Sequence, residues 1–195
     1  MGKLMVNGMN QGHAAVSDWG LSYFPDIPVA AHSMVADFGC GGGRNTAALL
    51  KRFPAATVTA LDYSKVACDK TKQFNRHEVQ IGRCNVVQGD VSRLPFEAAT
   101  FDVITAFETV YFWPGPVESF QEVWRVLKPG GTFMIVNESD GRNTKDEKWA
   151  GIIDGMRIFT QERLTQYLKD AGFSQIAAHV NRKQHWICLL AEKAR

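Results

Sequence analysis

A glycine-rich stretch near residue 40 holds the residues best suited to binding a ligand through the backbone. Its sequence from residue 35 is VADFGCGGGRNT: a short apolar run ends in Asp37, and Gly39, Gly41 and Gly43 follow. Glycine has no Cβ, so a ligand can contact the backbone at these positions. Apolar residues then recur at helical spacing, and the unpaired N–H groups at a helix start attract negative or polar ligand atoms. The stretch predicts a strand, a tight turn and a helix around a nucleotide-like cofactor, or else a structural turn without a ligand.

The spacing of these glycines separates the cofactor classes. A dinucleotide-binding turn has the pattern G-x-G-x-x-G, but the third glycine of that pattern falls here on Arg44 or Thr46. A nucleoside triphosphate loop needs a lysine directly after its glycines, and none follows. The pattern therefore argues against a nicotinamide dehydrogenase and against triphosphate binding.

Three aspartates stand where predicted strands end, namely Asp37, Asp62 and Asp90. The carboxyl ends of parallel strands border the ligand crevice of an open α/β sheet. Asp62 follows the glycine turn by about 20 residues, the offset of an acid that accepts hydrogen bonds from ribose hydroxyls. Asp90 could accept from an exocyclic amine such as that of adenine. The alternative for each is an aspartate in a surface turn or at a helix start.

Strand and helix patterns alternate along the chain, which predicts βαβ units and a parallel sheet covered on both faces. The last two strands follow each other through a turn at 182–184 and predict an antiparallel pair. Strands are expected over residues 34–38, 57–61, 85–88, 101–106, 132–137, 174–181 and 185–191, and helices over 45–53, 65–76, 116–127 and 161–171.

These motifs, taken in order, resemble the class I S-adenosylmethionine-dependent methyltransferases of the small methyltransferase domain 11/25 type. The resemblance covers about residues 33–140. Within the family, the chain is similar to uncharacterised bacterial members of the small-molecule type. It implies an α/β, Rossmann-like, doubly wound sheet of seven strands, mostly parallel, with a C-terminal antiparallel hairpin. The matching segments are residues 35–43 for the first motif, 60–64 for the ribose, 89–96 for the adenine, 101–104 for the fourth strand and 126–131 before the fifth.

The resemblance also implies which residues contact S-adenosylmethionine. The glycine turn would approach its amino-acid portion, and Asp37 would orient the turn and accept a hydrogen bond from the α-amino group, directly or through water. Asp62 would hold the ribose. Leu94 would lie opposite Tyr63 on the adenine, and the Val91 amide would meet a ring nitrogen. The implied cofactor-binding set is Asp37, Gly39, Cys40, Gly41, Gly43, Asp62, Tyr63, Asp90, Val91 and Glu108.

The acceptor is expected to contact residues 106–114, which follow the fourth strand. Glu108 stands there among aromatic residues, a setting that suits an amine or a cation; aromatic packing with a solvated or capping glutamate is the alternative. The segment lacks the two prolines of the [DN]-P-P-[YFW] motif, which argues against methylation of nucleic-acid bases. Glu108, Tyr111 and His13 are the candidate catalytic residues, and His13 is otherwise a surface histidine.

Two segments outside the motifs could also border the acceptor. We expect a single domain over 1–195, in which residues 1–33 form a helical extension or cap and residues 34–195 form the core. Residues 141–157 carry Trp149, Ile153 and Met156 at helical spacing. This second segment predicts either a lid or a packed helix.

Size, charge and cysteine usage limit the other possibilities. The chain has 195 residues, 45% hydrophobic and 22% charged, as in an ordinary globular domain. Its net charge of +2 comes without a block of lysines and arginines, so no nucleic-acid partner is expected. The four cysteines lack metal-binding spacing, which predicts no metal, reduced thiols and a cytoplasmic location. No apolar run reaches membrane-spanning length, so no membrane partner is expected.

The expected function is transfer of a methyl group from S-adenosylmethionine to a small molecule by direct displacement. Holding the reactants in line can remove about 7–11 kcal/mol of barrier, so alignment carries most of the catalysis. The alternatives are a protein or RNA methyltransferase and a non-catalytic cofactor-binding protein of the same fold. The chain is expected to act as a monomer or homodimer.

Overall fold

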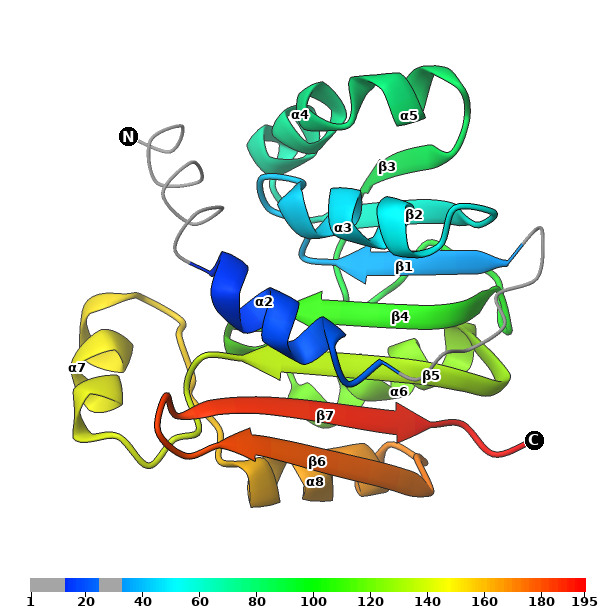
Figure 1. Cartoon of the computed structure of the whole chain (residues 1–195). Helices are drawn as coiled ribbons and strands as arrows, with labels where there is room; N and C mark the ends of the chain where they lie inside the picture. Colours follow the sequence, from blue (N-terminus) through cyan, green and yellow to red (C-terminus); the bar gives the residue numbers. More distant parts are fainter. Residues whose placement is uncertain (1–12, 25–32) are drawn as a thin grey trace.

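Seven strands form one sheet in the computed structural model, which describes residues 13–24 and 33–195. The strand order is β3-β2-β1-β4-β5-β7-β6, and β7 runs antiparallel to both β5 and β6 while the other pairs are parallel (Figure 1). This confirms the predicted Rossmann-like sheet with its C-terminal antiparallel hairpin. The strands are β1 Met34–Phe38, β2 Thr57–Asp62, β3 Cys84–Gln88, β4 Phe101–Phe107, β5 Leu127–Asn137, β6 Gln175–Asn181 and β7 Trp186–Glu192.

Helices cover both faces of the sheet. One apolar cluster lies on the side of α2 and α3, and a second lies on the side of α6 and α8 (Figure 1). Val35, Val58 and Val103 of three neighbouring strands are fully buried in the first cluster. The described helices are α2 Ala14–Leu21, α3 Arg44–Arg52, α4 Lys65–Phe74, α5 Arg76–Gln80, α6 Pro116–Val126, α7 Thr144–Ile152 and α8 Gln161–Asp170, with a short 3₁₀ helix at Val110–Phe112.

The helix α2 packs directly on the sheet. Val16 and Gly20 are buried against it, and a Cβ on Gly20 would lie 2.4 Å from a Val136 methyl carbon. The absence of a side chain at Gly20 therefore allows the helix to approach β5 closely. The described part of the expected helical extension is thus a layer of the fold, and residues 1–12 and 25–32 lie outside the described chain.

Two boundaries differ from the expectation by more than one residue. The single helix expected over 65–76 is divided into α4 and α5 at Asn75, whose side-chain amide donates to the carbonyls of Gly43 and Thr71. Such side-chain bonds compete with the helical pattern and end α4 at Phe74. The strand expected from residue 132 begins at Leu127, because Leu127 pairs with Phe101 before the register shifts.

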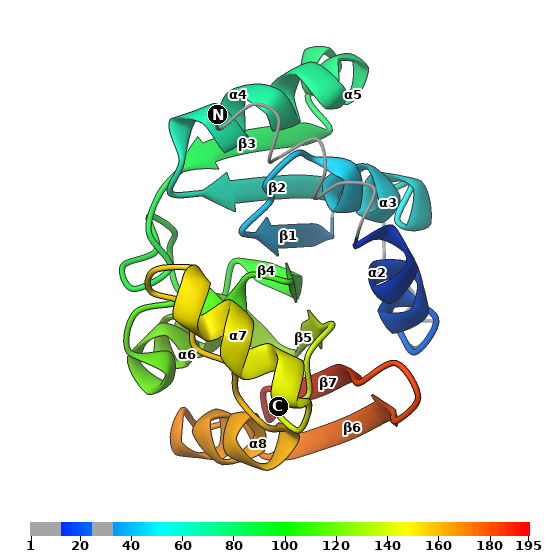
Figure 2. The same ribbon diagram turned by 90° about the vertical axis from the view of Figure 1, so that its left-hand side faces the viewer.

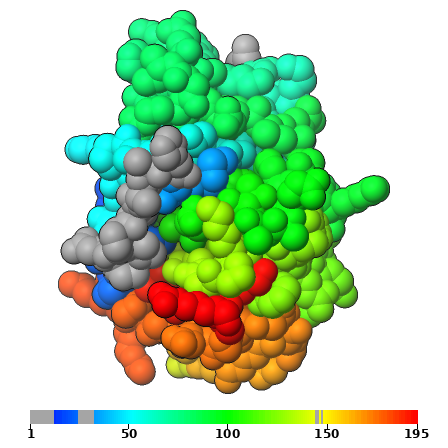
Figure 3. Space-filling view, turned by 90° about the vertical axis from the view of Figure 1, so that its right-hand side faces the viewer, coloured from blue at the N-terminus to red at the C-terminus, as the bar shows by residue number. Residues whose placement is uncertain are grey.

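Figure 3 shows the end of the molecule that lies opposite the carboxyl ends of β1 and β4. The C-terminal residues, in red, run across this surface beside the loop at Gly130, whose amide donates to the Lys193 carbonyl. All four cysteines are buried and free. Among the described helices, none has the length and apolar character needed to cross a membrane.

Candidate active site

A cavity of about 630 Å³ opens at the carboxyl ends of the parallel strands. The strand order reverses between β1 and β4, which is where ligands bind in open α/β sheets. Figure 2 looks onto these strand ends, with α7 lying in front of β4 and β5. The cavity lining consists of His13, Ser17, Gly39, Cys40, Gly41, Gly42, Arg44, Asn45, Leu61, Asp62, Tyr63, Ser64, Ala67, Gly89, Asp90, Val91, Phe107, Glu108, Thr109, Phe112, Trp113, Pro114, Asp154 and Gly155.

The glycines of the turn between β1 and α3 have different surroundings. Gly39 has φ +85°, and a Cβ there would lie 2.1 Å from Oγ1 of Thr109. Gly41 has φ +53°, and its missing side chain would extend into open space at the cavity. Gly43 is outside the lining, and a Cβ on it would lie 2.8 Å from Cα of Thr71 in α4. The turn thus offers its backbone to a ligand at Gly39–Gly41, while Gly43 serves helix packing.

Asp62 links the end of β2 to this turn. One carboxylate oxygen accepts from the Gly41 amide at 3.0 Å, and the other accepts from the Ser64 amide at 2.9 Å. Burial raises the pKa of Asp62, and these two hydrogen bonds oppose the rise. Each carboxylate oxygen can accept a further hydrogen bond, and Asp62 lines the cavity. The residue can therefore bind two neighbouring hydroxyl groups of a ligand.

Asp37 lies beneath the turn and does not line the cavity. Its carboxylate accepts from the Thr46 hydroxyl of α3 at 2.6 Å and from the Thr105 hydroxyl of β4 at 3.5 Å. Burial, and to a lesser extent the charge of Asp62, raise the pKa of Asp37 to about 6. Asp37 thus joins α3 to β4 through two hydroxyl groups and is too deeply buried to contact a ligand in the cavity directly.

The residues after β3 face the region expected to hold adenine. Asp90 accepts from the backbone amide and hydroxyl of Ser92, both at 2.8 Å, through one carboxylate oxygen. Val91 lines the cavity, as does Tyr63, which is 77% exposed. Leu94 is instead buried in the apolar core on the α6 side of the sheet and does not reach the cavity. The expected pairing of Tyr63 with Leu94 is therefore wrong.

The segment after β4 lines the cavity where the acceptor was expected, through Phe107–Thr109 and Phe112–Pro114. Tyr111 is buried behind this lining, and its phenol oxygen accepts from the Ser139 amide at 3.1 Å. A hydrogen bond from Tyr111 to Glu108 slightly opposes the rise that burial causes in the pKa of Glu108. The expectation that Tyr111 faces the acceptor is therefore corrected: the side chain supports Glu108 and the chain after β5.

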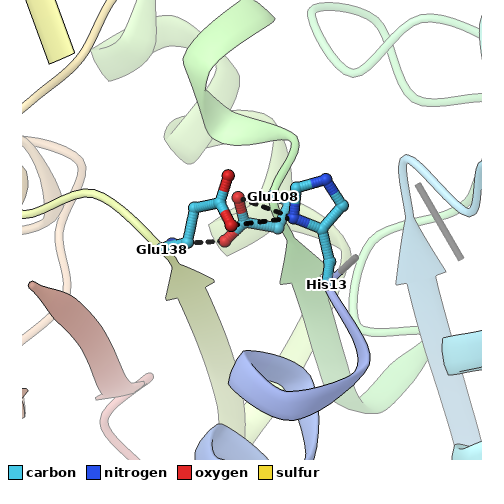
Figure 4. A group of neighbouring side chains, drawn as sticks. All are labelled: His13, Glu108 and Glu138. Carbon is cyan, nitrogen blue, oxygen red and sulfur yellow. Dashed lines mark hydrogen bonds and ion pairs between the residues drawn. The ribbon is translucent and has the colours of Figure 1, made fainter. Parts of the chain in front are cut away.

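Glu108 meets two partners from distant parts of the sequence (Figure 4). Its Oε1 accepts from the backbone amide of Glu138, and its Oε2 is 3.5 Å from Nδ1 of His13. Glu138 Oε2 is 3.1 Å from the same nitrogen, and the other ring nitrogen of His13 points away from both carboxylates (Figure 4). Burial, and next the charge of Glu138, raise the pKa of Glu108 well above its usual value.

Several site residues were missed by the sequence analysis. Arg44 and Asn45 directly follow the glycine turn, and Glu138 stands at a strand end as the three aspartates do. Their positions in the sequence could therefore have identified them as site residues. Ser17 and Asp154 had none. Asp154 and Gly155 line the cavity just after α7, whereas Trp149 is 54% exposed. Trp149 thus does not pack as the expected apolar stripe requires, and the segment borders the cavity.

The chain resembles known proteins both in sequence and in structure. A family profile described as methyltransferase domain matches residues 36–135. Cycloartenol-C-24-methyltransferase 1 of Oryza sativa subsp. japonica is 33% identical, over 73% of this chain and 44% of the plant protein. The chain spans about half the length of the curated relatives that it matches.

Two solved structures share the whole fold. The partner of a methyltransferase activator in a complex from Haloferax volcanii has a TM-score of 0.85 at 19% identity, covering 98% of this chain and 94% of its own. A geranyl diphosphate methyltransferase in complex with S-adenosylmethionine has a TM-score of 0.76 at 15% identity, covering 92% and 85%. At these identities the likeness concerns the fold alone.

Proposed function

The chain belongs to the methyltransferase domain family, and from this we propose that it transfers a methyl group from S-adenosylmethionine to a small-molecule acceptor by direct displacement. One observation carries the proposal. Asp62 presents a carboxylate to the cavity while it accepts a hydrogen bond from Gly41 of the glycine turn. The hydroxyl-binding acid and the backbone that would approach the donor's amino-acid portion are thereby held in one hydrogen-bonded unit.

The cofactor would occupy the part of the cavity bordered by β1, β2 and β3. Gly39, Cys40 and Gly41 would contact its amino-acid portion, and Asp62 its ribose. Asp90, Val91 and Tyr63 would border the adenine. All seven residues line one cavity, which supports this arrangement.

The acceptor would lie against Phe112, Trp113 and Glu108, on the β4 side of the same cavity. A cavity of about 630 Å³ falls in the range of small-molecule sites, which supports a small acceptor over a macromolecule. The methyl carbon is already activated by its sulfonium, so these residues act mainly by placing the nucleophile in line and excluding water. His13 and Glu108 both line the cavity, and they are our candidates for receiving a proton from the acceptor.

The cofactor assignment is tested by isothermal titration of the full chain with S-adenosylmethionine and S-adenosylhomocysteine. We expect binding, and we expect Asp62→Ala to weaken it at least tenfold, because two hydrogen bonds to the ribose are worth that much free energy. Asp69→Ala serves as the matched control, since Asp69 pairs with Lys65 on the exposed face of α4. Absent binding of both ligands would overturn the proposed function, and unchanged binding by Asp62→Ala would overturn the ribose assignment.

We also propose a cellular location and an oligomeric state for the protein. Four buried free thiols support a reducing compartment, and we expect the cytoplasm. We also expect a monomer or homodimer that acts on a small molecule.

A further inference from the structure

Three side chains with metal-ligand chemistry come together on the acceptor side of the cavity. These are His13, Glu108 and Glu138, here termed the His–Glu cluster, and one ligand atom from each lies within 4.8 Å of the others. Nδ1 of His13 is 3.1 Å from Glu138 Oε2 and 3.5 Å from Glu108 Oε2. Two donors that share an ion at about 2.1 Å, with an angle of about 90–110° between them, are about 3.0–3.4 Å apart. The distance from His13 to Glu138 falls within this range, and the distance from His13 to Glu108 lies 0.1 Å above it, so a small side-chain shift would let the three donors share one ion.

Each donor is positioned by a different part of the fold. Glu108 directly follows β4, and its backbone amide donates to the Val136 carbonyl of β5 at 2.9 Å. Because its Oε1 is occupied by the Glu138 amide, its Oε2 remains directed at His13. Glu138 follows β5, and His13 precedes α2, which packs on β5 at Gly20. The sheet thus sets the separation of the three donors.

The charge of the cluster favours a cation. The described residues give both carboxylates an ion pair with His13 and with no lysine or arginine. A protonated imidazole offsets one of the two negative charges, and the mutual repulsion of the carboxylates remains. A divalent ion offsets both charges while the imidazole binds it in the neutral form.

We propose that the His–Glu cluster binds one divalent transition-metal ion of the Mn²⁺ to Zn²⁺ series. An imidazole nitrogen together with two carboxylates suits these ions, whereas Mg²⁺ and Ca²⁺ prefer oxygen donors alone. His13 and Glu108 line the cavity, so the remaining coordination positions would face it and accept water or an oxygen or nitrogen atom of the acceptor. Metal binding stands independently of methyl transfer, and only this contact with the acceptor rests on the proposed function.

The probe for the site is Mn²⁺ alone, added to the metal-stripped full chain and followed by electron paramagnetic resonance. The sharp spectrum of free Mn²⁺ should diminish until one ion is bound per chain. Glu138→Gln should weaken binding at least tenfold. The variant retains the Glu138 amide that holds Glu108, and the Glu138 side chain is 48% exposed, so folding should be preserved. His13→Gln is a second variant, on a different element, with the same expected loss.

Glu192→Gln is the matched control, because Glu192 is exposed on β7 and pairs in register with Thr132 of β5, which lies six residues before Glu138 in the chain. It should bind Mn²⁺ as the wild type does. Zn²⁺ should displace Mn²⁺, following the usual order of affinities, and an equal concentration of Mg²⁺ should not. An undiminished Mn²⁺ spectrum with excess wild-type protein would overturn the proposal and leave the cluster as hydrogen-bonded ion pairs. Wild-type affinity in both variants would overturn the ligand assignment.

Titration with S-adenosylhomocysteine separates this inference from the proposed function. Glu138→Gln should bind that ligand as the wild type does, since Glu138 is not among the residues placed around the cofactor. Loss of Mn²⁺ binding with intact cofactor binding identifies the metal site alone. Intact Mn²⁺ binding without any cofactor binding overturns the proposed function and leaves the metal site standing.

Discussion

Asp37 illustrates how burial changes what a single side chain does. As an acid at a strand end it was expected near the ligand, yet it is fully covered and bound to Thr46 and Thr105. Because burial disfavours the charged form, the pKa of Asp37 is raised to about 6 in the folded chain, against 3.8 for an unperturbed aspartate. The same carboxyl therefore couples protonation to folding.

This coupling predicts a pH dependence of stability. Between about pH 4 and pH 6 the folded chain retains the Asp37 proton while the unfolded chain releases it, so the free energy of unfolding falls as the pH rises. From pH 4 to pH 7 this group should lower the free energy of unfolding by about 2 kcal/mol. Asp37→Asn cannot ionise and should lose this part of the slope. Urea denaturation of both proteins across that range provides the measurement, and parallel pH profiles would contradict the assignment.

The connection between β1 and α3 depends on glycines for two separable reasons. Gly39 is next to Thr109, so any side chain there collides with the segment after β4. Gly41 lines the cavity, and a Cβ there would come no closer than 4.0 Å to the described protein atoms outside its own chain neighbours. One glycine thus allows the contact between two loops, and for the other we propose that it allows the approach of a ligand.

We expect the corresponding alanine variants to differ in what they lose. Gly39→Ala should lower the free energy of unfolding by about 2–4 kcal/mol, because a positive φ and a steric collision add up. Gly41→Ala should lower it by about 1–2 kcal/mol, the cost of the positive φ alone, and should weaken S-adenosylhomocysteine binding at least tenfold. Urea denaturation and calorimetry measure both effects. Equal losses of stability in the two variants would contradict the assigned contacts.

The whole chain carries a net charge of only +2, and its lysines and arginines are dispersed along the sequence. Proteins that contact many phosphates lose affinity steeply with salt, about 10³–10⁵-fold between 50 and 200 mM for 6–10 contacts. This chain should therefore bind a structured RNA weakly and with little salt dependence. Fluorescence anisotropy at the two salt concentrations measures this, and a fall in affinity of a thousandfold would favour the alternative of an RNA methyltransferase.

Much of the architecture followed from short-range patterns. The alternation of strand and helix patterns predicted the order of the elements, and the spacing of Gly39, Gly41, Asp62 and Asp90 predicted a cofactor crevice at the strand ends. Such patterns are readable because backbone geometry and burial act over a few residues. The helix end at Asn75 was missed, since it depends on a hydrogen bond to Gly43, a residue more than a helix length away in the chain.

The linear sequence alone therefore determined the class of fold, the glycine turn and the acids that follow the strands. Only the tertiary structure decided that Asp37 lies beneath the turn, that Tyr111 lies behind the cavity lining and that His13 meets Glu108 and Glu138. No metal was expected, because these three residues have no local spacing that joins them. Their approach depends on the adjacency of β4 and β5 and on the packing of α2 across β5, and strand order is a property of the whole sheet.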